Sequence, residues 1–427
     1  VCQKSLEVSP YAEPKCTHVF SCDIKESARR FIMTFRRPQY LFGDMAGASA
    51  PRAFDHISSS TVGVPGSLDV LIAGFVCGDV SSLNAHQGAN KDCVAKGTKR
   101  TGSTFRGVLD YVASRFPRVM LLENVEAINC KPDDGVGPSN GEAVCAALRR
   151  IGYAVRMVTL QPSDHGVPQR RRRCWFICCL VKNGDVSDSG NSQELEKFLD
   201  STVRVVKDLM IPHSSLDMVL MPAKSPELRA WQDQRTSIPD EPQEPATKAM
   251  KWKELHKATF RAKGLRWPPE MENIYDSRDL ELIQQLPLRS REVIAFHDLT
   301  NPMSGPMSRL QPGDEIVVDV SQSINRTTAA LNLAPCVCPE SLLWMRRRRR
   351  LVEPNEELAL QGMPIYDEAD LSAFSHREVR DLAGMAFCGH NVLALLFAVF
   401  STHHFPDILA GPSLPASTPG TDSPFWP

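Results

Sequence analysis

Short apolar runs alternate with helix-like segments through the first 180 residues of the chain. The runs are nearly continuous, as in VLIAG, VMLLENV and CWFICCLV, which is the pattern of strands that are covered on both faces. They predict strands over residues 17–23, 69–74, 118–125, 154–160 and 173–181. Apolar residues near a 3.6-residue period predict helices over residues 26–36, 103–115 and 142–151. This alternation predicts an α/β fold with a mostly parallel sheet.

The pattern changes after about residue 182. Residues 182–275 are polar and rich in proline, and residues 276–345 keep no steady period. Helical patterns return over residues 355–362 and 379–400. We therefore expect a second, smaller and loop-rich domain in the second half of the chain.

Composition narrows the class of protein. The chain has 427 residues, of which 42% are hydrophobic, and 49 Lys plus Arg stand against 50 Asp plus Glu. This balance excludes a uniformly basic protein, and the longest apolar run, residues 392–400, is about half of what a bilayer requires. The 13 cysteines include no CxxC pair, so we expect free thiols in a reducing compartment and a soluble protein with no metal site.

Residues that can do chemistry follow three of the predicted strands. Cys77 follows the strand over 69–74, Glu123 and Asn124 end the strand over 118–125, and Gln169 with four arginines precedes the strand over 173–181. Ligands of an open parallel sheet bind beyond the carboxyl ends of its strands, so these groups are expected at one edge. Taken singly, each has an ordinary alternative: a small buried thiol, a helix cap and a solvated charge run.

In this order the motifs resemble those of the cytosine-5 DNA methyltransferases. GFVCGDVSS resembles the GFPCQxFS loop, LLENV the ENV motif, DHGVPQRRRR the YGVPQxRxR motif, and TGSTFRGVLDYV the RGxLFxxxxxxV segment. LVEPNEELALQGMP resembles the motif that ends in LQGFP, and DLAGMAF resembles QLAGNAV. The resemblance implies a Rossmann-like class I methyltransferase domain over residues 1–183 and 350–403. It also implies a target-recognition region over residues 184–349. Six prolines near the end of the chain separately predict a disordered tail over 404–427.

The resemblance also implies the reaction, which is transfer of a methyl group from S-adenosyl-L-methionine to carbon 5 of a flipped cytosine in double-stranded DNA. The thiolate of Cys77 would add to carbon 6 and make carbon 5 nucleophilic. Glu123 would donate to the ring and read its Watson–Crick edge. Arg171 and Arg173 would orient the base and neutralise charge near it.

Further residues are assigned to the cofactor and to DNA by the same resemblance. Asp23 would accept the ribose hydroxyls, Ile24 would pack on adenine, Asp44 would take the adenine amino group, and Phe75 would lie near the methyl donor. Asn124, Gln169, Lys96 and Arg100 would contact the base or DNA, the last two from a mobile loop over residues 82–100. Either aspartate could instead be only a helix cap. The arginine run over 346–350 could contact phosphate, act as a nuclear import signal or be plainly solvated.

Four departures from the family pattern stand out. No FxGxG turn is present, and we expect it, with a central strand, just upstream of Val1. Val76 replaces the proline before the nucleophile and Gly78 the usual glutamine, so we expect a less ordered loop. Met385 replaces the asparagine of LAGN, with Asn391 as a second possible match. Glu357, Leu358 and Ala359 stand where an arginine often precedes LQG.

Two alternative functions remain open from the sequence. A methyltransferase acting on transfer RNA would share the Cys and ENV motifs, although the CFT tripeptide typical of it is absent. A degenerate member would bind nucleic acid or cofactor without catalysis. For an active DNA enzyme we expect the nucleus in a eukaryote and the cytoplasm otherwise.

Overall fold

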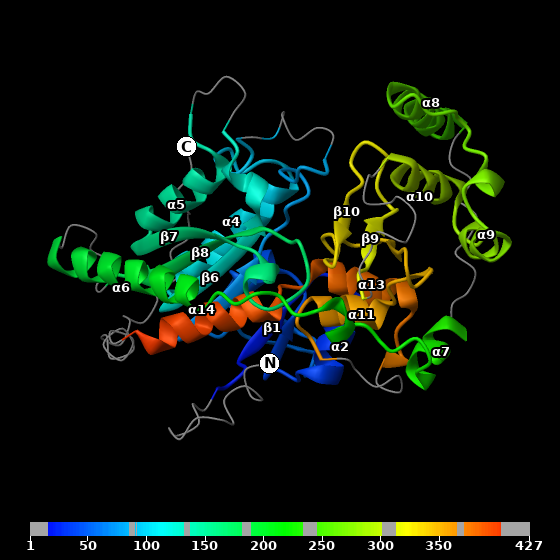
Figure 1. Cartoon of the computed structure of the whole chain (residues 1–427). Coiled ribbons are helices and arrows are strands. Elements are labelled where there is room, and N and C mark those ends of the chain that lie inside the picture. The colour runs from blue at the N-terminus through cyan, green and yellow to red at the C-terminus, as the bar shows by residue number, and fades with distance from the viewer. Residues whose placement is uncertain are drawn as a thin grey trace. The chain divides into compact units, whose positions relative to one another are not determined.

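The computed structural model describes residues 16–84, 90, 92–131, 137–181, 189–233, 246–300, 313–364 and 371–402. The chain divides into two compact units, coloured along the sequence in Figure 1. The first unit comprises Cys2–Leu160, Arg172–Met210 and Leu393–Pro427. The second unit comprises Val1, Gln161–Arg171 and Ile211–Val392. Each unit is described by itself below.

The first unit alternates strands and helices, as the apolar pattern predicts. Its elements are β1 (Phe20–Cys22), α2 (Glu26–Phe35), β2 (Tyr40–Phe42), α3 (Met45–Ala48), β3 (Arg52–Asp55), β4 (Ser60–Gly63), β5 (Val70–Gly74), α4 (Lys99–Arg115), β6 (Val119–Val125), α5 (Asn140–Arg150), β7 (Tyr153–Leu160), β8 (Arg173–Leu180) and α6 (Ser189–Asp208). All five predicted strands and all three predicted helices are present. The sequence pattern missed β2, β3 and β4, which are only three or four residues long.

The strands form two mixed sheets, so the prediction of a mostly parallel sheet is wrong for the described part of the chain. One sheet has the order β1-β2-β3-β4 and the other the order β5-β6-β8-β7. Two pairings are parallel, β1 with β2 and β5 with β6. The other four pairings are antiparallel.

The connection between β7 and β8 explains the antiparallel half of the second sheet. Residues 161–172 contain a short 3-10 turn, Pro162–Asp164, and no crossover helix. Parallel neighbours require such a crossover, so the chain instead returns antiparallel and β8 enters between β6 and β7. Pro162, Gly166 and Pro168 are the sequence signal for this return, because they break a helical pattern.

Helices cover both faces of the β5–β8 sheet. Val155 on β7 lies in one hydrophobic core with Val144 and Leu148 of α5. The next residue, Arg156, points to the opposite face, where its guanidinium pairs with Asp200 of α6 at 2.8 Å. Figure 1 shows α5 and α6 on opposite sides of these strands. The burial of β8, with Cys174 to Cys179 all fully covered, follows from this arrangement.

The second unit is more regular than the predicted loop-rich lobe. It contains α7 (Pro226–Asp233), α8 (Ala246–Ala262), α9 (Ser277–Gln284), α10 (Leu288–Thr300), β9 (Ile316–Asp319), β10 (Ala329–Leu331), β11 (Leu343–Met345), β12 (Arg350–Leu351), α11 (Pro354–Leu360) and α13 (His376–Met385). The four strands form an antiparallel sheet in the order β10-β9-β11-β12. The weak periodicity of residues 246–300 hid three helices, because α8 and α10 carry no sharp apolar stripe.

The boundaries of the compact units differ from the predicted domains. Residues 184–210 belong to the first unit, and residues 350–392 belong to the second. Compactness alone assigns no function, so the predicted catalytic and target-recognition regions stay predictions. The predicted tail over 404–427 lies outside the described residues.

The helix predicted over residues 379–400 is interrupted. It consists of α13, which ends at Met385, and α14 (Gly389–Ser401). Within the described residues, the segment His376–Ser401 is long and apolar enough to cross a membrane. Over half of it, 56%, is buried in the protein, as in the core helix of a soluble protein, so it is weak evidence for a membrane span.

Candidate active site

Cys77 lies in a tight turn after β5 in the first unit. The backbone N–H groups of Val80 and Ser81 donate to the Cys77 carbonyl at 3.1 and 2.9 Å. In the β5–β6 pairing, Gly74 stands opposite Glu123. Because these two strands are parallel, the turn that carries Cys77 begins at the sheet edge where Glu123 lies.

Glu123 and Arg173 form an ion pair across β6 and β8. The Nε atom of Arg173 is 3.1 Å from Oε1 of Glu123, and the side chains are only 15% and 12% exposed. The antiparallel register places Glu123 opposite Trp175 and Arg173 opposite Val125, so the pair is diagonal on one face of the sheet. The structure thus brings together two of the predicted catalytic residues, with the carboxylate oriented by a guanidinium.

Asn124 is bound to backbone in the structure. Its side chain is fully buried, and its Nδ2 donates to the Phe75 carbonyl at 3.0 Å. The strand alternation turns it away from Glu123 and toward the backbone that precedes Cys77, where it holds that backbone in place. Its contact with the base stays a prediction.

The predicted cofactor residues lie at the ends of β1, β2 and β5. Asp23 accepts the Lys25 N–H at 2.7 Å, and Ile24 beside it is 73% exposed. Asp44 caps α3 by accepting the Ala46 N–H at 3.0 Å, so its helix-cap alternative is realised. Phe75 is buried, with its ring 5.1 Å from that of Phe105.

Two acids gather beside Cys22. Burial, together with the charges of Asp44 and Asp23, raises the pKa of Cys22 to about 12. Burial also raises the pKa of Asp23, against the lowering effect of the Lys25 N–H. Because Cys22 pairs with Phe42 in the parallel β1–β2 ladder, the two acids follow the same sheet edge.

Gln169 and Arg171 donate hydrogen bonds to backbone carbonyls within the second unit. Both are buried, and Nε2 of Gln169 donates to the Leu360 carbonyl at 2.8 Å. The Arg171 guanidinium donates to the carbonyls of Val337 at 2.6 Å, Gly384 at 3.1 Å and Ala386 at 3.0 Å. The predicted roles of Gln169 and Arg171 in contacting and orienting the base stay predictions. These hydrogen bonds join the GVPQR, LQG and DLAGM segments, which are far apart in the sequence.

In the second half of the predicted mobile loop over residues 82–100, hydrogen bonds from another element fix the backbone. The Asn140 side chain accepts the Val94 N–H at 2.9 Å and donates to the Asn90 carbonyl at 3.1 Å. A Cβ atom at Gly102 would lie 2.2 Å from the Cys93 carbonyl, so α4 packs directly on this backbone. Asn140 belongs to no motif, and an asparagine at the start of a helix is typical of a cap, so the sequence carries no signal for this role.

The two basic residues predicted to contact DNA from this loop differ in their surroundings. Lys96 pairs with Asp92 at 2.5 Å. Arg100 lies in the first turn of α4 and is exposed. Residues 85–89 and 91, including Lys91, lie outside the described residues. The acid beside Lys96 reduces the attraction that this cation offers to phosphate.

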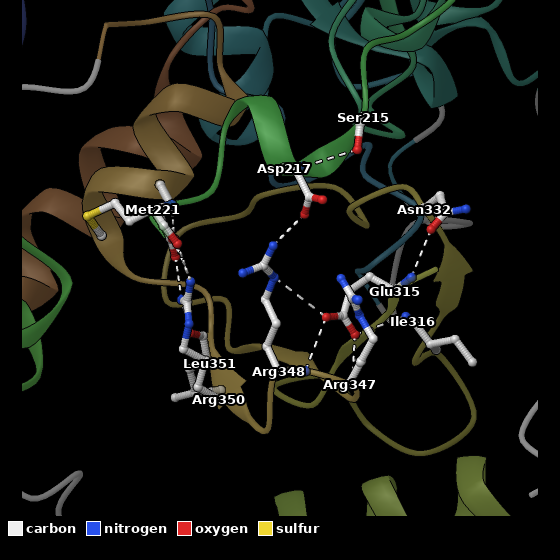
Figure 2. Close-up of polar contacts among 11 residues, drawn as sticks. Ser215, Asp217, Met221, Glu315, Ile316, Asn332, Arg347, Arg348, Arg350 and Leu351 are labelled. Carbon is white, nitrogen blue, oxygen red and sulfur yellow. Dashed lines mark hydrogen bonds and ion pairs between the residues drawn. The ribbon is translucent and has the colours of Figure 1, made fainter. Parts of the chain in front are cut away.

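Residues 346–349 of the arginine run form the turn between β11 and β12, and Arg350 begins β12. We call residues 346–350 the arginine turn. Glu315, only 1% exposed, accepts the backbone N–H groups of Arg347 at 2.7 Å and Arg348 at 3.2 Å, as Figure 2 shows. Ion pairs join Arg346 to Asp298, Arg348 to Asp217, Arg349 to Asp279 and Arg350 to Glu356.

The Arg350 pair is bidentate and buried. Its Nη1 and Nη2 atoms each lie 2.7 Å from an oxygen of Glu356, which is fully covered. The side chains of Arg346, Arg348 and Arg349 are only 12%, 15% and 23% exposed. The arginine turn is therefore not a plainly solvated run, because the fold uses four of its five cations in internal ion pairs.

Two buried thiols of the first unit, Cys174 and Cys93, are poorly suited to act as nucleophiles. Burial raises the pKa of Cys174 to about 12 and that of Cys93 to about 11. Both side chains therefore stay protonated near neutral pH, and the thiolate is the reactive form. Among the described residues, no group of three or more His, Cys, Asp or Glu could hold a metal ion.

Comparison with known proteins identifies the family. The family model described as C-5 cytosine-specific DNA methylase matches residues 17–364. The chain belongs to this family. Its fold is accordingly that of a mixed α/β methyltransferase.

Each of two relatives is matched over only part of its own length. The chain is 28% identical to the DNA (cytosine-5-)-methyltransferase DMT5 of Cryptococcus neoformans over 381 residues, which are 86% of this chain and 15% of that protein. It is 28% identical to the type II methyltransferase M.HhaI of Haemophilus parahaemolyticus over 156 residues, 36% of this chain and 42% of that protein. The chain thus spans less than half of each relative.

A solved structure gives a weaker likeness. The Entamoeba histolytica methyltransferase EhMeth superposes with a TM-score of 0.43 and 11% identity over 93% of this chain and 94% of that chain. A likeness at this level carries no argument about the site. The assignment of site residues therefore depends on the sequence motifs and on the geometry described above.

Proposed function

We propose that the protein transfers a methyl group from S-adenosyl-L-methionine to carbon 5 of cytosine in DNA. The observation that carries this proposal is the Glu123–Arg173 ion pair, at the sheet edge where the turn bearing Cys77 begins. A thiol, a carboxylate and a guanidinium are the groups that the reaction needs, and family membership supports their roles. Arg171 and Asn124 are left as positioning residues in this proposal.

The residues at the ends of β1 and β2 fit an adenosine. An exposed isoleucine offers an apolar surface for the purine, and the adjacent Asp23 carboxylate can accept from ribose hydroxyls. Asp44 at the same edge keeps one carboxylate oxygen for a ligand while the other caps α3. When bound, S-adenosyl-L-methionine supplies an electrophilic methyl group. Phe75 is assigned to this region by its place beside Cys77.

The chain's own groups would perform the remaining chemistry on the base. The Cys77 thiolate forms a bond to carbon 6, and the electron pair released makes carbon 5 nucleophilic. The Glu123 carboxylate, oriented by Arg173, accepts from the exocyclic amino group of cytosine and so selects that base. After carbon 5 gains the methyl group, water takes its proton. The electron pair of that C–H bond re-forms the double bond between carbons 5 and 6, and the Cys77 thiolate leaves with the pair of the C–S bond, which restores the aromatic ring.

We also propose that the base is flipped out of double-stranded DNA, because a thiol cannot reach carbon 6 inside the stack. Residues 184–349 are proposed to form the target-recognition region, and Lys96 and Arg100 to approach phosphate. An enzyme acting on DNA would work in the nucleus of a eukaryotic cell, or in the cytoplasm otherwise. No feature of the described residues names a target sequence.

The test is methyl transfer by the complete protein to DNA, with tritiated S-adenosyl-L-methionine as donor. We expect incorporation of tritium into DNA by the wild type and none by Cys77→Ser, which keeps the size of the side chain and removes the thiolate. DNA containing 5-fluorocytosine should trap a covalent adduct with the wild type, because carbon 5 then has no proton to lose.

Two results would contradict the proposal. Incorporation no higher than that of Cys77→Ser would favour a degenerate binding protein. Transfer to transfer RNA and not to DNA would favour the RNA-directed alternative. Glu123→Gln provides a further control, which should lower the rate while the Cys77 thiol remains available for alkylation.

A further inference from the structure

The residue before the nucleophile raises a specific structural problem. The family has proline at this position, and proline has no backbone N–H. Val76 stands here instead, so its N–H needs a hydrogen-bond acceptor, and its backbone lacks the fixed φ that a proline ring provides. The sequence therefore predicts a less ordered turn at the point where Cys77 must be held most accurately.

The structure provides an acceptor on α4. The Val76 N–H donates to Oγ1 of Thr104 at 3.1 Å. The same hydroxyl donates its own hydrogen to the Arg100 carbonyl, one helical turn earlier, at 2.8 Å. A hydroxyl has one hydrogen to donate and two lone pairs to accept with, so the two bonds are compatible. The bond to Arg100 also fixes the Thr104 side chain in one orientation.

The Thr104 bond is one of several hydrogen bonds that hold the backbone around Cys77. Asn124 holds the Phe75 carbonyl, Thr104 holds the Val76 N–H, and the Cys77 carbonyl accepts from the turn that follows it. Three successive residues thus each have a backbone group fixed, two of them by side chains from different elements. A second tie to α4 lies close by, where the Asp79 carboxylate accepts the Thr101 N–H at 2.7 Å.

We propose that Thr104 is a positioning residue for the nucleophile, and that its hydroxyl replaces by a hydrogen bond the rigidity that proline gives this turn elsewhere in the family. The proposal rests on the proposed function, since it assumes that Cys77 attacks the base. Thr104 touches neither the base nor DNA in it and acts only through the backbone of Val76.

A double-mutant cycle tests this coupling directly. Thr104→Val keeps the shape of the side chain and removes the acceptor, while Val76→Pro removes the N–H that needs one. The four proteins of the cycle are compared in their complete form by the single-turnover rate of covalent capture on 5-fluorocytosine DNA with S-adenosyl-L-methionine present. Ser103→Ala is the matched control, because Ser103 also bonds the Arg100 carbonyl, at 3.1 Å, and is exposed.

We expect Thr104→Val to slow capture roughly tenfold in the Val76 protein, in line with the penalty of an unpaired N–H. In the Val76→Pro background, the same substitution should change the rate less than about twofold, because no N–H remains to be held. Thr104→Ser and Ser103→Ala should capture at the wild-type rate. The KM for DNA should stay constant while kcat falls, since the hydroxyl contacts no substrate.

The outcomes separate this proposal from the proposed function. If the wild type forms no covalent adduct with 5-fluorocytosine DNA, the proposed function itself is overturned. Capture by Thr104→Val at the wild-type rate, or an equal slowing in both backgrounds, would overturn the positioning role alone. If Thr104→Val does not fold, the double variant should fold and react, and its failure to do so would also overturn the role.

Discussion

At the scale of single residues, Glu357 shows how burial sets a pH response. Its side chain on α11 is fully covered, with Oε1 lying 3.2 Å from Nε of Arg380 on α13. Burial raises the pKa of Glu357 to about 8, although the Arg380 charge opposes the rise. The folded state therefore retains a proton that the unfolded chain releases near pH 4.5.

The free energy of unfolding should consequently fall as pH rises between about 4.5 and 8, by about 1.4 kcal/mol per pH unit from this group. Glu357→Gln cannot titrate, so its stability should change less over the same range. Urea unfolding at pH 6, 7 and 8 measures both slopes. Identical slopes for the two proteins would contradict the assignment of this titration to Glu357.

Glu356 provides a second prediction at this scale. Besides the bidentate contact with Arg350, its oxygens accept the N–H groups of Met221 at 2.7 Å and Glu353 at 2.8 Å. Glu356→Ala leaves a buried guanidinium without its partner and should lower the free energy of unfolding by about 3–5 kcal/mol. Glu340→Ala, which breaks an exposed pair with Arg377, should cost less than about 1 kcal/mol. Equal losses in denaturant titrations would argue against the buried pair.

At the scale of elements, α5 fixes the backbone of a segment that follows Cys77, the proposed nucleophile. Asn140, 2% exposed, holds the backbone of Asn90 and Val94 through both ends of its amide. Asn140→Ala should therefore increase amide hydrogen exchange over residues 92–98, because those N–H groups lose their anchor. Ser139→Ala is the control: it weakens the capping box of α5, yet should leave exchange over 92–98 unchanged. Equal effects of the two variants would show that only helix stability matters.

The elements themselves were largely predictable, while their pairing was not. The apolar runs that became β5 to β8 were found because burial on both faces leaves a continuous signal. The order β5-β6-β8-β7 depends on where the chain returns after β7, which a short irregular connection decides. In β3 and β4 the exposed residues at Arg52, Phe54, Ser60 and Thr61 leave too little apolar pattern to detect.

At the scale of the whole molecule, the chemistry was easier to predict than the supporting contacts. Motif order predicted that Cys77, Glu123 and Arg173 lie near one sheet edge, because groups at the carboxyl ends of neighbouring strands meet there. The motifs did not predict that the side chains of Asn124, Gln169 and Arg171 donate to backbone carbonyls. Strand alternation and tertiary packing decide which way such a polar side chain points, and neither is written in a motif.

The ion pairs of the arginine turn also affect the electrostatic potential that a distant polyanion experiences. Each guanidinium that has a carboxylate within a few ångströms produces mainly a dipole, and dipole fields fade well inside a Debye length of roughly 8 Å at physiological ionic strength. The densest run of positive charge in the sequence therefore contributes little to the electrostatic potential at a distance from the protein. It should recruit few counterions and contribute little to electrostatic steering, so added salt should leave its contacts almost unaltered.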